Sequence, residues 1–273
     1  MPLSGNTAKR IIVSIVTIPL ILLSSYYGGI FFLSLVCMLG AAGYYEFSRM
    51  AHHKKAFASD IVGIAAVSAL IVNAYFHFSS LNVAVYGIVL LLLLTELFRN
   101  NDSAVLNLGA SLLGILYPGM FSAAVIEIRQ YFVGDYHQGG LLIIAIMITI
   151  WACDSAAFFI GSAIGRHKLF VRVSPKKSWE GAVAGFISAT ATMIISRELF
   201  LGFISFENSL IIGILVGIVG QLGDLVESLL KRDAGVKDSS NFIPGHGGIF
   251  DRFDSLLMSA PAVYLYLYYF VQP

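Results

Sequence analysis

The chain has 273 residues, of which 58% are hydrophobic and 12% are charged, and its formal net charge at pH 7 is +1. Soluble domains carry about 25% charged residues, so this composition excludes an ordinary soluble protein and indicates an integral membrane protein. The near-zero net charge also excludes a broadly basic molecule, and no nucleic-acid partner is expected.

Long apolar stretches recur along the chain. One crossing by an α-helix needs about 20 apolar residues, and the sequence predicts about nine such spans. They lie roughly at 11–27, 29–47, 60–77, 81–98, 104–125, 140–162, 181–197, 208–230 and 255–271. The expected fold is therefore an all-α, polytopic bundle of transmembrane helices. Cys37 and Cys153 fall inside these stretches and are expected to be buried thiols, not parts of a disulfide or zinc site.

The positions of lysine and arginine predict the orientation. With a cytoplasmic N-terminus, all of them except Arg129 and Arg197 fall in cytoplasmic segments, as expected of a multi-pass protein of the inner (plasma) membrane. The loops 163–180 and 231–254 then share the cytoplasmic face. Acids and glycine-rich loops concentrate after residue 138. We therefore expect 1–138 to serve packing, oligomerisation and lipid access, and 139–273 to form the candidate catalytic region.

Asp154 and Asp224 are acids inside predicted spans. At a rise of 1.5 Å per residue, they lie about 13 Å and about 10 Å from the cytoplasmic ends of their helices. Ionisable groups are costly inside a membrane and usually face a cavity, a partner or an ion. We expect the two acids to share one pocket open to the cytoplasm. The alternative is that each pairs with a lysine or caps a neighbouring helix.

Two pairs of acids repeat a spacing of three residues. Asp224 and Glu227 share one helix face with Ser228, and Asp251 and Asp254 lie at the start of the last span. Carboxylates from two helices suit a hard cation such as Mg²⁺, which leaves room for substrate phosphates. Acids in a first helical turn also favour the helix dipole, which is the alternative for the second pair.

The loop between these acids is rich in bases. Lys231, Arg232 and Lys237 alternate with acids, a pattern that favours phosphate binding over a plain lipid-binding patch. The positive-inside bias alone is the alternative for Arg232.

A glycine-rich turn ends this loop. Gly247 and Gly248 allow backbone N–H groups to approach an anion closely. His246 is a candidate proton carrier or phosphate donor, and a purely structural hydrogen bond is the alternative for it.

A second basic loop covers residues 165–181. Ser174 and Pro175 are typical of a helix N-cap followed by proline at the first helical position. This interpretation places Lys176 and Lys177 in a first helical turn, where the dipole disfavours cations. Two lysines there favour binding of a polyanion at the helix end, and the positive-inside bias is the alternative.

Two glutamates lie near the ends of their spans beside an arginine. Glu46 and Glu96 are each expected to pair with the arginine three residues later, Arg49 and Arg99. Glycines spaced four residues apart predict close helix packing. These are Gly161 with Gly165, Gly181 with Gly185, and Gly213 with Gly217.

Three stretches together carry a resemblance. They read Ser228-x-Leu230-Lys231-Arg232, Lys237-Asp238 and Ile243-Pro244-x-His246-Gly247-Gly248-Ile249-x-Asp251-Arg252-Phe253-Asp254. This pattern resembles the signature of the phosphatidate cytidylyltransferase (CDP-diacylglycerol synthase) family, in its compact bacterial form. The run 174–181 is similar to a second recurring stretch of the family, with Ser178 where threonine is common.

The resemblance implies a reaction in phospholipid biosynthesis. CTP and phosphatidate in the bilayer would give CDP-diacylglycerol and pyrophosphate with Mg²⁺, a second cation being left open, and a homodimer is expected. One rival is a CTP-using polyprenol or phytol kinase, against which the uninterrupted pattern argues. The other is a transporter with Asp154 and Asp224 on an ion path, against which the lack of inverted repeats argues.

The resemblance also implies roles for individual residues. Asp224 and Asp251 would ligate the metal, with Asp254 as a ligand or as support for one. The other candidate catalytic residues are Lys231, Lys237, His246 and Arg252, and the candidate substrate-binding residues are Asp154, Ser174, Lys176, Lys177, Ser228, Arg232, Gly247 and Gly248. Among these, Lys176 and Lys177 would hold the triphosphate of CTP.

Overall fold

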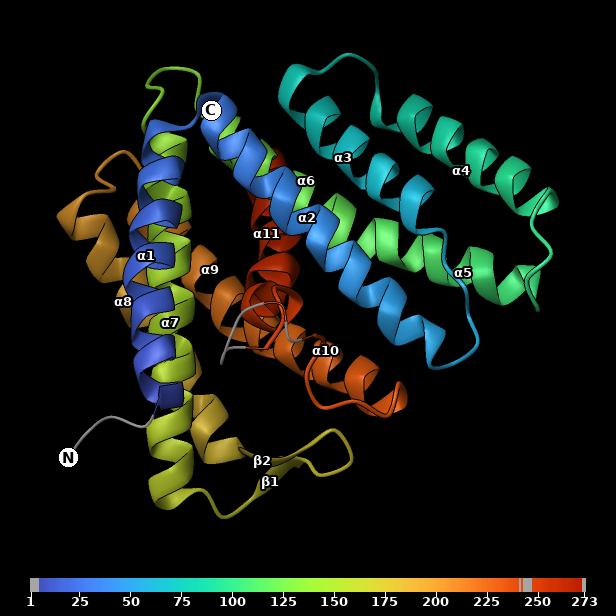
Figure 1. Cartoon of the computed structure of the whole chain (residues 1–273). Helices are drawn as coiled ribbons and strands as arrows, with labels where there is room; N and C mark the ends of the chain where they lie inside the picture. Colours follow the sequence, from blue (N-terminus) through green and yellow to red (C-terminus); the bar gives the residue numbers. More distant parts are fainter. Residues whose placement is uncertain (1–4, 241, 243–246, 272–273) are drawn as a thin grey trace. The chain divides into compact units, whose positions relative to one another are not determined.

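The structure is a computed structural model that describes residues 5–240, 242 and 247–271, with the backbone alone for residues 5–12. It consists of helices and one small sheet (Figure 1). The α-helices are α1 (Gly5–Tyr27), α2 (Gly29–His52), α3 (Asp60–Phe76), α4 (Leu81–Leu97), α5 (Ala104–Gly114), α6 (Phe121–Gln130), α7 (Gln138–Ile164), α8 (Trp179–Leu199), α9 (Phe206–Leu215), α10 (Gln221–Asp233) and α11 (Phe250–Phe270). Each predicted span coincides with a helical stretch, so the expected predominance of helix is confirmed.

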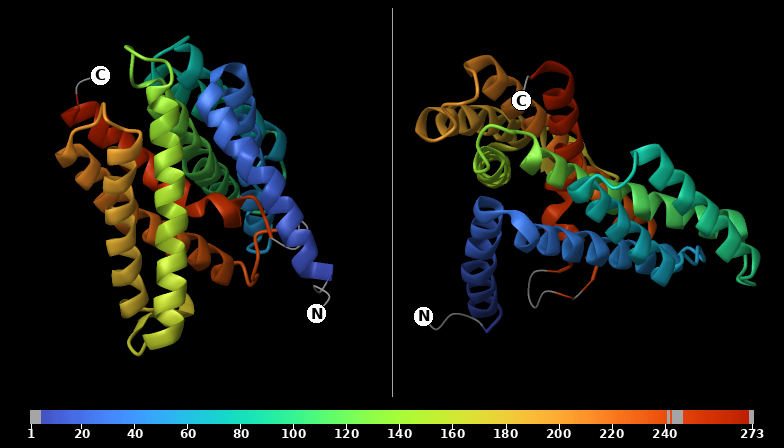
Figure 2. Two further views of the ribbon diagram at one scale, coloured as in Figure 1. Left: turned by 90° about the vertical axis from the view of Figure 1, so that its left-hand side faces the viewer. Right: turned by 90° about the horizontal axis from the view of Figure 1, so that it is seen from above.

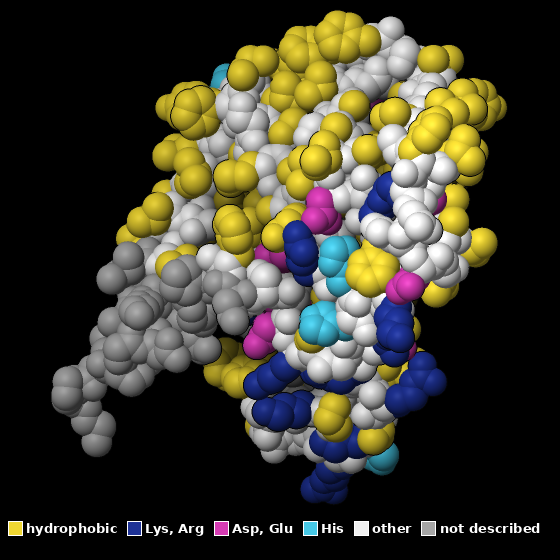
Figure 3. Space-filling view, turned by 45° about the vertical axis from the view of Figure 1, so that its right-hand side comes forward, with side chains coloured by type: hydrophobic (Ala, Val, Ile, Leu, Met, Phe, Trp, Pro, Cys, Tyr) yellow, Lys and Arg dark blue, Asp and Glu magenta, His cyan; other side chains and the backbone are white. Residues whose placement is uncertain are grey.

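Several helical stretches are long and apolar enough to cross a membrane. They are Gly29–His52, Ala104–Gln130, Gln138–Ile164, Trp179–Leu199 and Phe206–Asp233. Shorter apolar helices cover Val13–Tyr27, Asp60–Phe76 and Leu81–Leu97. Hydrophobic side chains cover much of the face drawn in Figure 3, as lipid-facing helices require. The chain therefore has the character of a membrane protein, and the number of crossings stays a prediction.

Two π-helical segments join shorter helices into long ones. Segment η1 (Ile115–Met120) lies between α5 and α6, and η2 (Val216–Gly220) lies between α9 and α10. Pro118 lies inside η1, where its missing N–H interrupts the α-helical hydrogen-bond pattern. Directly after η2, the side-chain amide of Gln221 donates from Nε2 to the backbone carbonyl of Gly217 at 2.6 Å. This bond satisfies a carbonyl in the widened turn.

The chain divides into two compact units. Unit 1 comprises Met1–Ser24, Gly28–Glu127 and Leu230–Arg252, and unit 2 comprises Ser25–Tyr27, Ile128–Leu229 and Phe253–Pro273. Within unit 1, α2 packs on α3, and α4 packs on both α3 and α5. Within unit 2, α8 contacts both α7 and α9. The long α7 and α8 run side by side, yellow-green and gold in Figure 2.

Glycines allow the helices of unit 2 to pack closely, as their spacing predicts. A Cβ on Gly181 would lie 2.7 Å from the Ala157 carbonyl oxygen and 3.0 Å from the Gly161 Cα, so α7 and α8 meet at backbone distance. A Cβ on Gly213 of α9 would lie 3.0 Å from the Thr190 Cα of α8. Small residues let helix backbones approach in this way, and dispersion contacts then hold them.

The expected pairing of the two glutamates is half right. Glu96 does pair with Arg99, with Oε2 and Nη1 3.0 Å apart. Glu46 does not pair with Arg49, because Arg49 binds Asp60 at the start of α3 instead, at 2.8 Å. Only 2% of Glu46 is exposed, and its carboxylate accepts hydrogen bonds from the segment before α11.

Candidate active site

A β-hairpin precedes α8 and carries the basic loop. Its strands β1 (Lys168–Phe170) and β2 (Ser174–Ser178) are antiparallel, with Lys168 opposite Ser178 and Phe170 opposite Ser174. The interpretation of Ser174 as an N-cap is therefore wrong. The N-cap is Ser178, whose Oγ accepts a hydrogen bond from the Gly181 N–H at 3.2 Å.

The two lysines of this loop consequently lie in a strand. Lys176 and Lys177 belong to β2, and the helix begins only at Trp179. Pairing with β1 draws the chain into an extended conformation, and the Trp179 N–H continues the pairing by donating to the His167 carbonyl at 2.9 Å. A polyanion at these lysines would thus meet a strand and the start of α8 together, not a helical turn.

Unit 2 contains a pocket with a volume of about 520 Å³. Its charged lining comes from α7, the hairpin and α10, and consists of Asp154, Lys168, Lys176, Lys177 and Asp224. Asp154 and Asp224 line the same pocket, as predicted, and Asp224 also pairs with Lys177, which was the alternative expected for it. Sequence reasoning did not single out Lys168, whose signal was only its place in a basic loop. Three lysines and two carboxylates that line one pocket can bind a polyanion and a cation together.

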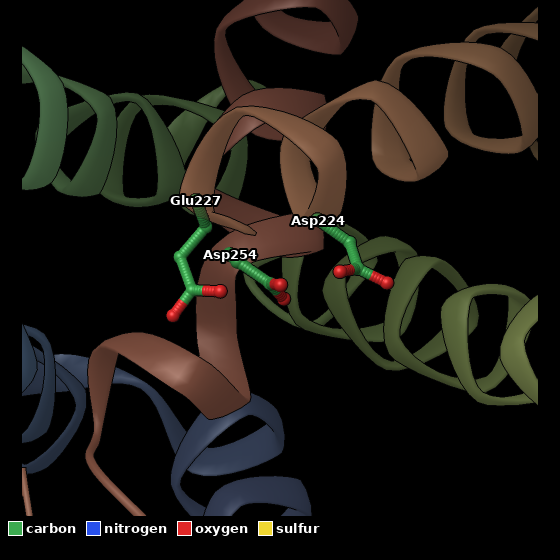
Figure 4. Close-up of side chains that lie close together, drawn as sticks. All are labelled: Asp224, Glu227 and Asp254. Atoms are coloured by element: carbon green, nitrogen blue, oxygen red, sulfur yellow. The ribbon is translucent and has the colours of Figure 1, made fainter. Parts of the chain in front are cut away.

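Beside the pocket lies a cluster of three carboxylates. Asp224 and Glu227 of α10 and Asp254 of α11 each place a carboxylate oxygen within 4.8 Å of the others. In the view of Figure 4 the Asp254 carboxylate lies between the other two. Glu227 and Asp254 are buried. Oxygen ligands from two helices fit a hard divalent cation such as Mg²⁺. Glu227 was not among the predicted ligands, although its spacing from Asp224 had placed both on one face.

Asp224 belongs to both the pocket and the cluster. Its Oδ2 lies 2.5 Å from the Lys177 Nζ, and its Oδ1 accepts a longer hydrogen bond from the Ser228 hydroxyl at 3.4 Å. Asp224 therefore connects the lysines, which suit a triphosphate, with the acid cluster, which suits a metal ion.

In unit 1, the loop after α10 brings Lys231 and Asp251 together. The Lys231 Nζ lies 2.5 Å from Asp251 Oδ1, and Lys231 is only 9% exposed. The other oxygen of Asp251 accepts from the Ser239 N–H at 2.9 Å, the Ser239 hydroxyl at 2.8 Å and the Gly248 N–H at 2.8 Å. The predicted acid and base thus form a hydrogen-bonded group that fixes the end of the loop.

The other predicted residues of the loop differ in their exposure. Lys237 and Arg252 are exposed. Arg232 is also exposed, and its guanidinium donates to the Val236 carbonyl at 2.9 Å. Gly247 has φ +82°, in the region that favours glycine, and Gly248 is buried. His246 lies outside the described residues.

Comparisons with known proteins agree with the resemblance in the sequence. Residues 8–270 match the cytidylyltransferase family. The chain belongs to this family. It is 33% identical over 266 residues to a phosphatidate cytidylyltransferase of Bacillus subtilis, covering 95% of this chain and 97% of the relative. It is 34% identical over 264 residues to one of Pseudomonas aeruginosa, covering 93% and 94%. A 41% identical match over 156 residues, to one of Haemophilus influenzae, covers 55% and 54%.

Proposed function

We propose that this member of the cytidylyltransferase family is a phosphatidate cytidylyltransferase, which makes CDP-diacylglycerol and pyrophosphate from CTP and phosphatidate. Its similarity to relatives of that name over nearly their full length supports the proposal. The structural observation that carries it is the pocket in which Lys168, Lys176 and Lys177 face Asp154 and Asp224.

The reaction needs stabilisation of negative charge more than it needs a general base. An oxygen of the phosphatidate phosphate attacks the α-phosphorus of CTP, the α–β anhydride bond breaks, and pyrophosphate leaves with the electron pair. The nucleophile is already anionic, so no strong base has to remove a proton. The difficulty is to bring two polyanions together and to neutralise the charge that develops on the leaving group.

The lysines of the hairpin would bind the triphosphate. Lys176 and Lys177 project from β2 and Lys168 from β1, all on the lining of one pocket. Ammonium groups bind phosphate oxygens through charge-assisted hydrogen bonds, which are about twice as strong as neutral ones. Lys177 would exchange its contact with Asp224 for a phosphate oxygen while staying near the same place. Ser174 and Asp154 remain proposed substrate-binding residues.

The acid cluster would hold the divalent cation. Asp224, Glu227 and Asp254 supply carboxylate oxygens close together, and Asp251, one turn before Asp254 on α11, remains a proposed ligand. A bound Mg²⁺ would supply positive charge to phosphoryl oxygens of the substrate. The proposal leaves a second cation open.

The loop after α10 would serve the phosphates of the reacting groups. We expect the cationic side chains of Lys231, Lys237 and Arg252 to neutralise phosphate charge. His246 would carry a proton or donate a hydrogen bond to a phosphate. The remaining proposed substrate-binding residues are Ser228, Arg232, Gly247 and Gly248. The diacyl chains would stay in the bilayer while the headgroup meets CTP at the cytoplasmic face. Residues 1–138 would then serve packing and a homodimer, and 139–273 catalysis.

The decisive experiment is product formation by the purified protein from labelled CTP and phosphatidate, with Mg²⁺ or with EDTA. We expect Mg²⁺-dependent CDP-diacylglycerol and pyrophosphate in equal amounts. Phosphorylation of an isoprenoid alcohol in place of this product would favour a lipid kinase. Ion flux in liposomes without nucleotide, and no lipid product, would favour a transporter.

A thiol-labelling experiment tests the orientation. In a background that lacks Cys37 and Cys153, Lys55→Cys and Arg172→Cys should react with an impermeant reagent only after the cells are opened. Gly134→Cys and Gly202→Cys, in loops assigned to the other face, should react in intact cells. Labelling of Arg172→Cys in intact cells would overturn the assigned orientation.

A further inference from the structure

The buried carboxylate of Glu46 organises a segment that is distant in the sequence. Glu46 lies within α2, and 2% of it is exposed. Its Oε1 accepts from the Ser240 hydroxyl at 2.6 Å and from the Ile249 N–H at 2.9 Å. Its Oε2 accepts from the Ser239 hydroxyl at 2.9 Å and from the Phe250 N–H at 2.8 Å. All four donors belong to the segment 239–250.

Two of these donors come from the start of α11. The first N–H groups of a helix have no acceptor within the helix, and negative charge beside them is favourable. Glu46 accepts from the N–H groups of Ile249 and Phe250, while the Asp251 side chain accepts from the N–H of Gly248. The start of α11 is thus held by one carboxylate of its own and by one from α2.

Ser239 connects the two carboxylates. Its hydroxyl oxygen lies 2.9 Å from Glu46 Oε2 and 2.8 Å from Asp251 Oδ2. A serine hydroxyl has a single proton, so it donates to one of them at a time. A Cβ on Gly248 would overlap both the Ser239 hydroxyl and the Glu46 carboxylate. Glycine is therefore required for this close approach.

We propose that Glu46 is a positioning residue for cytidylyl transfer. It holds Ser239, Ser240 and the start of α11 so that Asp251, Lys231 and the Gly247–Gly248 backbone keep one arrangement. A small displacement of reacting groups can cost about a hundredfold in rate, even when the change lies away from the chemistry. Glu46 itself needs no contact with a substrate. This inference rests on the proposed function for its link to catalysis, but the contact between α2 and the segment stands without it.

The test compares Glu46→Gln with Glu96→Gln in the full-length purified protein. Glutamine keeps the size of the side chain but turns an NH₂ group toward donors. We expect kcat to fall between about tenfold and about a hundredfold, while KM for CTP changes by less than about threefold. Amide exchange at Ile249 and Phe250 should become at least about tenfold faster, because a hydrogen bond to a charged group is lost.

Glu96→Gln is the matched control. Glu96 is also a buried glutamate of an apolar helix, 7% exposed, but it binds Asn107 and Arg99. It should lose stability without changing kcat or the exchange at Ile249. Equal losses of kcat in both variants, or normal kcat in Glu46→Gln, would overturn the proposal.

Milder variants keep the test decisive if Glu46→Gln does not fold. Ser239 touches both carboxylates and Ser240 only Glu46, so Ser239→Ala should lower kcat several-fold more than Ser240→Ala. A larger loss of kcat in Ser240→Ala would refute the idea that Glu46 acts on the reaction by positioning Asp251. If the wild-type protein makes no CDP-diacylglycerol, the proposed function fails, and the exchange rates still decide whether Glu46 holds the segment.

Discussion

Lys177 of β2 and Asp224 of α10 form an ion pair, with Nζ and Oδ2 2.5 Å apart, on the lining of the pocket in unit 2. Both side chains are partly exposed, at 27% and 36%. An ion pair in such a place adds little stability, so its value lies in placing a cationic and an anionic group where a nucleotide and its metal ion must meet. Asp224 is the side chain that links the lysines to the acid cluster.

Replacement of Lys177 should weaken nucleotide binding. In Lys177→Met, we expect KM for CTP to rise about tenfold or more, because a charge-assisted contact to the triphosphate is lost. The control is Arg172→Met, which removes a cation of the same hairpin outside the residues that line the pocket. Initial rates over a range of CTP concentrations measure the effect. A similar rise in both variants would mean that only the general charge of the hairpin matters.

Replacement of Glu227 should change the metal requirement. The carboxylate is buried beside Asp224 and Asp254, and loss of one oxygen ligand weakens the binding of a hard cation. We expect Glu227→Gln to need at least about tenfold more Mg²⁺ for half-maximal activity. Glu207→Gln, at the exposed start of α9, should leave this concentration unchanged. An unaltered Mg²⁺ dependence in Glu227→Gln would remove Glu227 from the proposed metal site.

The sequence predicted the helices better than the local geometry around the site. Apolar length determines a span almost by itself, so every predicted span coincides with helix. Ser174 and Ser178 are both good N-caps, and Pro175 favoured the first. The choice of Ser178 depends on strand pairing between residues several positions apart, which a local helix rule does not see.

Some contacts between segments that are distant in the chain could not be predicted from the sequence. Arg49, one turn along α2, was the expected partner of Glu46, but the Glu46 carboxylate accepts from Ile249, 203 residues further along the chain. The face of α10 that carries Asp224 and Glu227 was readable from spacing. The place of Asp254 beside this face depends on the rotation of α11 about its axis. Packing sets that rotation, so spacing along the chain could not predict it.

A methyl group on Gly181 should separate α7 from α8. Its Cβ would lie 2.7 Å from the Ala157 carbonyl oxygen, so Gly181→Ala should lower the free energy of unfolding by about 1–3 kcal/mol. Gly87→Ala is the control, since a Cβ there meets nothing within 4 Å. It should be neutral or stabilise by about 0.5–1 kcal/mol, because alanine favours a helix over glycine. Thermal unfolding in detergent checks both, and equal midpoints would contradict close packing at Gly181.

Arg129 should matter for stability and not for the reaction. It is 5% exposed and donates to the carbonyls of Ser25 and Tyr26 at the end of α1, at 2.8 and 3.1 Å, and to that of Tyr136 at 2.6 Å. A cation at a helix C-terminus is favourable, and its loss removes the donor to the carbonyl of Ser25, which is buried. Arg129→Met should therefore lower the free energy of unfolding by about 3 kcal/mol.

Arg197→Met is the matched control, because Arg197 is the other arginine assigned to the outer side. Its side chain is 29% exposed, pairs with Glu198 and donates to one carbonyl, that of Ile204, at 3.2 Å. Arg197→Met should lower the free energy of unfolding by no more than about 1 kcal/mol. Below the unfolding transition, kcat of Arg129→Met should stay near that of the wild type, since Arg129 does not line the pocket. A large loss of kcat with normal stability would instead tie the end of α1 to the active site.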